Sequence, residues 1–467
     1  MLYIGGWTMT KIYDMTKGSI FKNLLIVALP VLLTSISQMA YNLTDMFWIG
    51  RVDSIGLNEN DAISGIGTAG YITWFAFGII LIAKIGTSVK VSHAVGQQRH
   101  DLINQYATNG LTLSIVLGLL FSLFVFLFRA NLIEIFNIDK AEVINAANDY
   151  LVIVGSFLFV QFITSSFSAI NEGLGKTALN FSILVIGLIM NIILDPILIL
   201  TFKMGVSGAA IATVISQMTT LIIFIIIYLI NRKRSWQYRL NYLQPKMMKD
   251  IVKIGIFAGL QSMFFTSISI VIARMIFIYG EKVMAAQRIG SQIEQLTWMI
   301  SGGFQTALTV FVGQNFGAKQ GDRIKKGTIM LSKMLIPYSL FVGAILFFFA
   351  EPLIRIFVNI EETVEYGKQY LKIISIAQVF MMLEGIGTGL FNGIGKSIIP
   401  SIVGIFGNSL RIPFALWLSD NFGYSGIWWS LNISDILKGI VLLFASLYIL
   451  INIDKIINSR KIIYKFN

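Results

Sequence analysis

Residues 173–177 read Gly-Leu-Gly-Lys-Thr, and residues 393–397, in the second half of the chain, read Gly-Ile-Gly-Lys-Ser. About thirty residues after each copy comes another glycine-rich stretch, Gly-Val-Ser-Gly-Ala at 205–209 and Gly-Tyr-Ser-Gly-Ile at 423–427. A Gly-Gln pair at 96–97 recurs at 313–314. The two copies of each stretch lie roughly 220 residues apart, which is far more than the period of a solenoid or a propeller. The chain is therefore predicted to contain two copies of one unit, laid end to end.

The composition indicates that this repeated unit lies in a membrane. Of the 467 residues, 55% are hydrophobic and 13% are charged, and the mean hydropathy is +0.75, whereas a soluble domain carries about 25% charged residues. Apolar stretches long enough to cross a bilayer occur about twelve times. We expect them at 22–49, 62–90, 104–128, 147–170, 179–200, 206–230, 251–279, 283–311, 328–350, 369–391, 398–418 and 424–451. The predicted fold is an all-α integral membrane protein, with twelve transmembrane helices in two pseudo-symmetric six-helix lobes.

The most polar long segment, 231–250, divides the chain nearly in half and is rich in basic residues. We interpret it as a basic cytoplasmic linker between an N-lobe at 1–235, holding helices 1–6, and a C-lobe at 236–467, holding helices 7–12. The stretch from Met1 to Lys17 lacks an apolar core followed by a small-residue cleavage site, so it is not expected to be a signal peptide. A duplicated helix bundle of this kind is typical of a secondary transporter.

The net charge of +12 is explained by topology rather than by a nucleic-acid partner. With an even number of spans, both termini lie on one side, and the basic residues concentrate in the loops of that side. The opposite loops carry acids, namely Asp53, Glu59, Asp61, Glu134, Asp139, Glu142, Glu281, Glu351, Glu361, Glu362 and Glu365. The positive-inside rule then places both termini in the cytoplasm. We expect a multi-pass protein of the cell membrane that binds no nucleic acid.

Several patterns resemble catalytic motifs but lack the structural context that those motifs require. A Gly-x-Gly-x-x-Gly match at 65–70 opens an apolar helix instead of following a strand, so it does not predict a dinucleotide site. The Gly-Lys-Thr and Gly-Lys-Ser turns lack the first glycine of a phosphate-binding loop, since Ile170 and Leu390 stand there. The chain has no cysteine, which excludes disulfides, iron–sulfur clusters and thiolate zinc sites. Its two histidines, His93 and His100, show no metal-site spacing with a carboxylate. We therefore expect neither an enzyme nor a cofactor.

Ionisable side chains within membrane spans are costly and are candidates for function. Those of most interest here are Asp45, Asp195, Arg274, Arg288, Glu294, Glu384, Arg411 and Asp435. Asn191 and Asp195 are four residues apart and so share one helix face, and Pro196 opens the backbone beside them. Asp45 and Thr213 are expected at a similar depth. These four oxygen-bearing side chains suit a small hard cation or a proton; the alternative is that each aspartate bonds locally and holds a kinked helix.

The second lobe does not repeat this set of residues. Arg411 stands at the position that corresponds to Asn191, and the place of Asp195 is taken by an apolar stretch near Ala415. Two interpretations of the remaining charges stay open, a structural pair between Arg288 and an acid of another helix, or contacts to a substrate. Arg411 can also simply lie close to a helix end.

At these residues the chain resembles the multidrug and toxic compound extrusion (MATE) transporters over nearly its whole length. The resemblance rests on Gln-Met-Ala-Tyr-Asn-Leu-Thr-Asp at 38–45 after Pro30, on Asn191 with Asp195-Pro196, on Gly-Ala-Ala-Ile-Ala-Thr at 208–213 and on Gly-Gln-Asn-Phe-Gly-Ala at 313–318. It implies a two-lobed antiporter that exports cationic or amphipathic drugs and toxic compounds in exchange for sodium or protons, by alternating access.

The resemblance also implies roles for single residues. In the prokaryotic branch with an N-lobe cation site, the cation ligands map onto Asp45, Asn191, Asp195 and Thr213, which would hold sodium if sodium is the coupling ion. The hinge of the first helix maps onto Pro30. Other branches use an acid in helix seven, but 257–279 contains none. Further residues expected in the substrate cavity or its coupling are Gln38, Tyr41, Asn42, Gln261, Arg288, Glu294 and Glu384.

The expected partners are small-molecule substrates and membrane lipid, with a monomeric protein and no cofactor besides the coupling ion. Two other functions remain open. A flippase of lipid-linked polysaccharide or peptidoglycan precursors shares this general architecture, but it would line its cavity with several basic residues to hold pyrophosphate. A membrane enzyme or a receptor is the other alternative.

Overall fold

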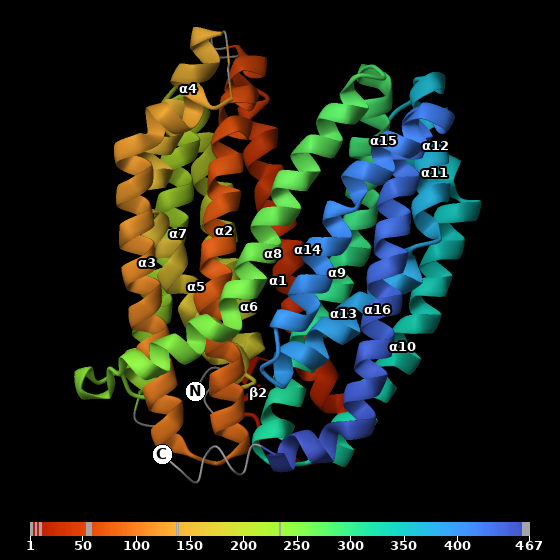
Figure 1. Ribbon diagram of the computed structural model, residues 1–467. Coiled ribbons are helices and arrows are strands. Elements are labelled where there is room, and N and C mark those ends of the chain that lie inside the picture. The colour runs from red at the N-terminus through yellow and green to blue at the C-terminus, as the bar shows by residue number, and fades with distance from the viewer. Residues whose placement is uncertain are drawn as a thin grey trace. The chain divides into compact units, whose positions relative to one another are not determined.

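The computed structural model describes residues 3–4, 7–8, 12–52, 58–136, 138, 140–232 and 235–459, which are almost entirely helical (Figure 1). The helices of the first half are α1 (Ile20–Ile49), α2 (Glu59–Gly96), α3 (His100–Glu134), α4 (Ala141–Ser156), α5 (Leu158–Gly173), α6 (Thr177–Pro196) with the π-helical segment η2 (Ile197–Thr201), and α7 (Gly205–Asn231). A 3-10 turn, η3 (Leu240–Tyr242), precedes α8 (Pro245–Phe277).

The second half continues with α9 (Glu281–Gly317), α10 (Gly321–Phe348), α11 (Ala350–Arg355), α12 (Glu361–Ser375), α13 (Gln378–Gly393), α14 (Ile398–Ser409), α15 (Arg411–Phe422) and α16 (Tyr424–Ser459). Two short strands near the N-terminus, β1 (Tyr3–Ile4) and β2 (Trp7–Thr8), pair antiparallel. Among the charged residues of the predicted loops, those outside the described residues are Lys11, Asp53, Asp139, Lys233, Arg234, Arg460, Lys461 and Lys465, and the side chain of Glu59 is not described either.

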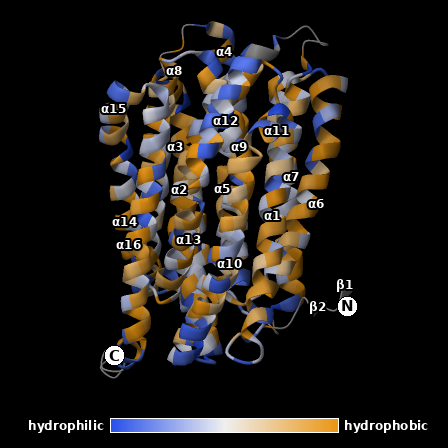
Figure 2. Cartoon of the chain, turned by 90° about the vertical axis from the view of Figure 1, so that its right-hand side faces the viewer, coloured by the Kyte–Doolittle hydropathy of each residue, from blue (hydrophilic) through white to orange (hydrophobic). Residues whose placement is uncertain are grey.

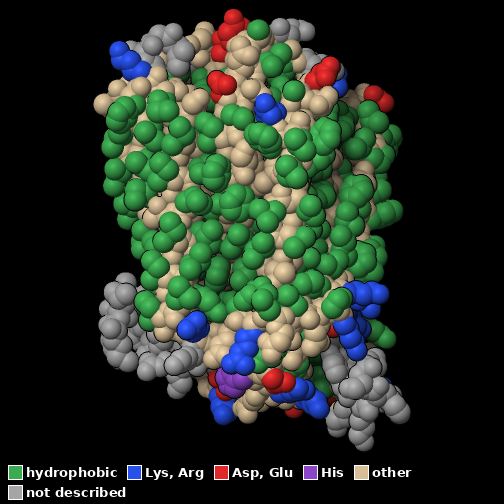
Figure 3. Space-filling view, turned by 90° about the vertical axis from the view of Figure 1, so that its left-hand side faces the viewer, with side chains coloured by type: hydrophobic (Ala, Val, Ile, Leu, Met, Phe, Trp, Pro, Cys, Tyr) green, Lys and Arg blue, Asp and Glu red, His purple; other side chains and the backbone are tan. Residues whose placement is uncertain are grey.

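The predicted all-α membrane fold is confirmed. Within the described ranges, nine helices are long and apolar enough to cross a membrane, or up to eleven if each of two bent pairs is one span. Helix α9, with 37 residues, occupies the remaining expected span; its first half carries Lys282, Arg288 and Glu294. The middle of the helices is mostly hydrophobic, and hydrophilic residues gather toward their ends (Figure 2). On the face formed by the first-half helices, a hydrophobic band lies between two polar ends, and histidine and most of the basic side chains gather at one of them (Figure 3).

The fourth and tenth predicted spans are each built from two helices, which the sequence analysis did not predict. Helices α4 and α5 meet at 47°, and α12 and α13 at 49°. No proline marks either bend, but each upstream helix ends in a serine whose hydroxyl donates to a carbonyl of its own last turn, Ser156 to Val152 and Ser375 to Lys372. Such side-chain bonds compete with the helix backbone and bend it. One backbone amide beyond the first bend, that of Phe159, is recovered by the hydroxyl of Ser122 at 2.8 Å.

The glycine-rich turns have the same conformation in both halves. Gly175 and Gly395 have φ of 73° and 72°, in the left-handed region that glycine tolerates. Each donates its amide to the carbonyl three residues earlier, on Glu172 and Asn392 respectively, at 2.8 Å. The duplication inferred from sequence is thus visible in the backbone.

The third sequence echo was aligned wrongly by one helical turn. Helix α2 ends at Gly96 and helix α9 ends at Gly317. Two residues after each end, Gln98 and Lys319 have positive φ, 57° and 60°. Gly96 therefore corresponds to Gly317 and not to Gly313. Gly313 and Gly317 lie four residues apart on the same face of α9, so either glycine gives a similar local pattern in the sequence.

By its internal contacts the chain divides into two compact units. Unit 1 contains Leu29–Val95 and Arg99–Gly259 together with the described residues before Asp14, and unit 2 contains Asp14–Ala28, Gly96–Gln98 and the chain from Leu260 onward. Helices α1 and α8 each contribute to both units. In α1, the boundary between the two units lies beside Pro30. The lobe boundary at 235/236 stays a prediction made from sequence.

In unit 1, helix α2 packs on the start of α8 with the two backbones in contact. A Cβ added to Gly86 would lie 2.1 Å from the carbonyl oxygen of Ile251, and one added to Gly255 would lie 1.8 Å from that of Ile82. Since even a methyl group does not fit there, glycine is required at both positions. Small residues allow this close approach of helices within a membrane.

Candidate functional site

The end of helix α6 supplies a buried amide and a buried carboxylate. Asn191 and Asp195 have no exposed surface, and the side-chain amide of Asn191 donates to Asp195 Oδ1 at 3.1 Å. Pro196 closes α6, and the π-helical segment η2 follows directly. Proline has no amide to donate, and π segments often mark functional sites. Both side chains therefore point into unit 1 from a locally distorted helix.

Helices α1 and α7 bring the two other predicted ligands to the same place. Thr213 of α7 is only 4% exposed. The carboxyl group of Asp45 in α1 lies within interaction distance of both Asp195 and Asn191. The four side chains proposed from sequence thus lie together inside unit 1.

Five oxygen atoms in this cluster are buried and have no hydrogen bond of acceptable geometry. They are Tyr41 OH, Asp45 Oδ1, Asn191 Oδ1, Asp195 Oδ2 and Thr213 Oγ1. A buried polar group without a partner costs about 1–3 kcal/mol, so five at one place favour binding of a small positive ion. Hard cations prefer oxygen ligands of this kind, and a carboxylate pair can also take up a proton. In the described ranges, no group of three or more His, Cys, Asp or Glu side chains is arranged for a metal.

Two tyrosines belong to this cluster. Tyr41 is predicted to lie in the substrate cavity or to take part in its coupling, whereas Tyr150 of helix α4 is not predicted as a site residue. Both hydroxyls lie close to Thr213, and both rings lie within electrostatic range of the two aspartates. Tyr41 had a local signal, since it is four residues before Asp45 on the same helix face. Tyr150 had none, because it reaches the site only through tertiary packing.

The other first-helix candidates lie apart from this cluster or are not described. Gln38 is exposed, and the side chain of Asn42 lies outside the described part of the structure. Pro30 is buried inside α1, and Thr34 donates its hydroxyl to the carbonyl of Pro30 at 2.9 Å. Gln261, in unit 2, packs against Gly404, where an added Cβ would lie 2.2 Å from its amide nitrogen.

Unit 2 contains a buried chain of alternating charges. Arg411 donates to Asp435 Oδ1 at 2.7 Å, and its Nε donates to Ser434 at 3.2 Å. Lys438 lies 2.8 Å from Asp435 Oδ1 and 3.0 Å from Glu384 Oε2. Arg411 does begin a helix, as one interpretation had it, but it is also buried in an ion pair. Lys438 was missed, although its spacing of three residues from Asp435 predicts a shared helix face.

Glu294 lies at the edge of this chain of charges. The hydroxyl of Tyr370 donates to Glu294 Oε2 at 3.3 Å, and Glu294 is within electrostatic range of Arg411 and Asp435. Arg288 is exposed and takes part in none of the ion pairs found in the described ranges. The interpretation of Arg288 as half of a structural pair is thus unsupported, and Arg411 has that role instead.

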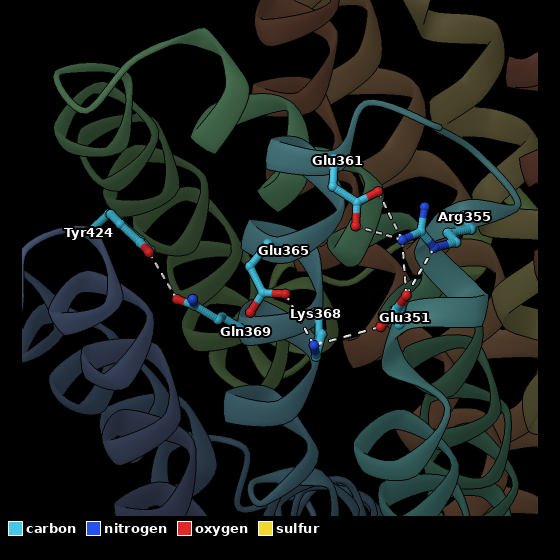
Figure 4. Close-up of polar contacts among 7 residues, drawn as sticks. All are labelled: Glu351, Arg355, Glu361, Glu365, Lys368, Gln369 and Tyr424. Carbon is cyan, nitrogen blue, oxygen red and sulfur yellow. Dashed lines mark hydrogen bonds and ion pairs between the residues drawn. The ribbon is translucent and has the colours of Figure 1, made fainter.

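A second group of charges lies at the junction of α11 and α12 in unit 2 (Figure 4). Arg355 bonds Glu351 at 3.0 Å and Glu361 at 2.8 Å, and Lys368 reaches Glu351 and Glu365 at 3.6 and 3.1 Å. The Arg355 guanidinium lowers the pKa of Glu351. These side chains are largely exposed, and such pairs contribute little to stability. They fasten neighbouring helices and do not form a site.

A family model and individual relatives match this chain over most of its length. The MatE family model matches residues 30–197 and 258–417. The probable multidrug resistance protein NorM of Thermotoga maritima is 28% identical over 417 residues, 87% of this chain and 88% of that protein. The multidrug export protein MepA of Staphylococcus aureus (strain MSSA476) is 24% identical over 435 residues, 91% and 93% of the two chains.

Solved structures show the same fold. A multidrug resistance MATE family transporter of the MOP superfamily in an outward-facing conformation superposes with a TM-score of 0.87 at 21% identity, covering 94% of this chain and 98% of that one. A MATE structure in a bent conformation gives 0.88 at 21% identity, covering 95% and 98%.

Proposed function

Because the chain belongs to the MatE family, we propose that it exports cationic or amphipathic drugs and toxic compounds across the cell membrane in exchange for sodium or protons. Its transport follows alternating access. The names of two relatives, a probable multidrug resistance protein and a multidrug export protein, support this class of substrate. The many membrane-spanning helices make it a multi-pass membrane protein.

The observation that carries this proposal is the group of five buried, unpartnered oxygen atoms in unit 1. Two of them belong to the carboxyl groups of Asp45 and Asp195. A sodium ion would find amide, hydroxyl and carboxylate oxygens there, and a proton would find two neighbouring carboxylates, which resist simultaneous ionisation. Both ions relieve the same electrostatic cost, so either can drive export.

Coupling follows from the position of the site on helix α1. Tyr41 and Asp45 lie on the same helix as Pro30. An ion that binds Asp45 and Asp195 stabilises the arrangement of α1 in which these groups meet. A ligand shifts a conformational equilibrium only by its differential affinity for the two states. Loading the site would therefore favour the outward-open state and release of the exported compound.

The experiment uses the purified protein in liposomes that hold ethidium, with a sodium gradient and a proton gradient imposed separately. We expect ethidium movement to accelerate with one of the two gradients and to stop when that gradient is collapsed by an ionophore. Ethidium movement equal to that of protein-free liposomes under both gradients would reject the proposal.

The flippase alternative gains no support from the buried bases of unit 2. The buried bases of unit 2, Arg411 and Lys438, are both engaged by carboxylates, and so do not offer free positive charge to a pyrophosphate. Drug export remains the better interpretation.

A further inference from the structure

Unit 2 holds a cluster of three carboxyl groups and two cationic groups. Glu384, Asp435 and Glu294 bring three carboxylates, whereas Arg411 and Lys438 bring two cations. Asp435 lies between both cations, at 2.7 and 2.8 Å. Buried carboxylates are stable only when a positive group or a proton compensates them. A proton on one of the carboxyl groups, or one more cation, would make the cluster neutral.

Lys438 forms ion pairs with two acids, Asp435 and Glu384. Its ammonium group lies 2.8 Å from Asp435 and 3.0 Å from Glu384. The side chain of Glu384 is 18% exposed, while that of Lys438 is 6% exposed. If another cation engages Glu384, Lys438 keeps its bond to Asp435, so no buried charge loses its partner. The Glu384–Lys438 ion pair is thus the contact in this cluster that another cation can replace.

The backbone of helix α14 is shaped to hold Lys438 in this position. A Cβ added to Gly407 would lie 2.4 Å from Lys438 Cγ and 2.8 Å from Cδ. The aliphatic stem of the lysine therefore lies directly across the glycine. The same glycine accepts a hydrogen bond at its carbonyl from Ser434 at 2.8 Å, and Ser434 in turn binds Arg411.

Aromatic rings lie at the Glu294 and Arg411 end of the cluster and indicate the kind of cation that fits. Trp298, one turn after Glu294 on α9, is 40% exposed and within hydrogen-bonding reach of Glu294. Its ring lies 5.7 Å from that of Phe265, which also faces the Arg411 guanidinium at 5.6 Å. Aromatic faces attract organic cations as well as burying their apolar parts. An aromatic organic monocation would bring one further positive charge and an apolar ring to a cluster that already holds aromatic faces.

We propose that Glu384 binds the cationic group of the substrate and that Lys438 competes with the substrate for Glu384. This inference rests on the proposed export of such compounds. In the free protein Lys438 neutralises Glu384. When the substrate arrives, the lysine releases Glu384 and remains bound to Asp435. Lys438 thereby sets the affinity and favours substrates that carry a positive charge.

The test measures ethidium binding to the purified full-length protein in detergent by fluorescence anisotropy. Glu384→Gln removes the acceptor and should weaken binding roughly fivefold, and Lys438→Met removes the competitor and should tighten it by a similar factor, on the order of 1 kcal/mol each. Glu384→Gln should cost more in the Lys438→Met background than in wild type. Because Lys438→Met is expected to gain affinity, a misfolded variant cannot imitate the result.

A matched pair of glycine variants tests the same point without changing any charge. Gly407→Ala should displace the lysine stem and tighten ethidium binding, whereas Gly302→Ala, whose added Cβ meets nothing within 4 Å, should leave it unchanged. Unchanged affinity in Glu384→Gln, or equal or weaker affinity in Lys438→Met, would overturn this inference alone. A wild-type protein that neither binds nor moves ethidium would overturn the proposed function as well.

Discussion

Thr213 offers a test that distinguishes sodium from protons as the coupling ion. Its hydroxyl is buried without a well-formed hydrogen bond, close to the hydroxyls of Tyr41 and Tyr150. A threonine oxygen can coordinate sodium, but it cannot carry a transported proton. Thr213→Val keeps the shape of the side chain and removes that oxygen.

If sodium is the coupling ion, Thr213→Val should raise the sodium concentration for half-maximal efflux roughly tenfold, the effect of about 1.4 kcal/mol. If protons couple transport, the dependence on pH should change much less. Thr219→Val on the same helix is the control, since that hydroxyl is already bonded to the carbonyl of Ile215 at 2.8 Å. Equal loss in both variants would contradict a role of the Thr213 oxygen as ligand.

A buried lysine in the turn between α5 and α6 reduces stability at neutral pH. Lys176 is 7% exposed, and its ammonium group donates to Ser235 at 2.8 Å, with no carboxylate paired to it in the described ranges. Burial lowers the pKa of Lys176 from 10.5 to about 8. Below pH 8 the lysine is charged in both states, so the folded protein carries the full desolvation cost. Between about pH 8 and 10.5 only the unfolded chain stays protonated, so stability rises with pH.

Lys176→Met should therefore stabilise the protein at pH 7, on the order of 2 kcal/mol after loss of the Ser235 bond. The measurement is thermal unfolding in detergent at pH 7 and pH 10, and the gain should shrink at the higher pH. Lys249→Met, at an exposed position, should change little at either pH. A gain that is independent of pH would contradict this explanation.

At the scale of single residues, the sequence predicted what helical spacing controls. Asn191 and Asp195 share a face because four residues make about one turn, and their hydrogen bond follows from it. Tyr150 and the contact of Lys438 with Glu384 required knowledge of which helices pack together. The sequence of one helix does not contain that information.

Among the elements, the crossing of α2 and α8 is highly sensitive to side-chain size. Gly255→Ala places a methyl group 1.8 Å from a backbone oxygen, which only a shift of the helices can relieve. Overpacking of this kind costs typically about 1–3 kcal/mol. We expect a clear decrease in the thermal unfolding temperature.

The control is Gly67→Ala, also on α2, where an added Cβ meets nothing within 4 Å. It should be neutral or slightly stabilising, because alanine favours a helix over glycine. Equal unfolding temperatures for the two variants would show that α2 and α8 do not approach this closely.

The helical elements were predictable where their hydropathy is continuous, and less so where they bend. Proline is the strongest sequence signal for a kink, but the bends after Ser156 and Ser375 have none. Helix α9 was expected as a span although its first half is polar. The prediction rested on the length of the apolar stretch at 283–311.

For the whole molecule, the distribution of charge predicts which end faces the cytoplasm. The absence of cysteine makes this directly measurable, because a single introduced cysteine is then the only thiol. Gln97→Cys lies just after α2 and Asn359→Cys between α11 and α12, both at exposed positions.

A membrane-impermeant maleimide should label Asn359→Cys in intact cells and Gln97→Cys only after the membrane is opened. The reverse pattern would place the basic loops outside. Labelling of neither variant in opened membranes would contradict their exposure.

The central claim is that loading of Asp45 and Asp195 with a positive ion drives export, and the most direct test compares three variants in the same liposomes. Asp45→Asn and Asp195→Asn should abolish gradient-driven ethidium efflux while the proteins stay folded and monodisperse. Asp149→Asn, the same change at an exposed site of unit 1, should transport like wild type. Efflux at the wild-type rate in both Asp45→Asn and Asp195→Asn would contradict the account.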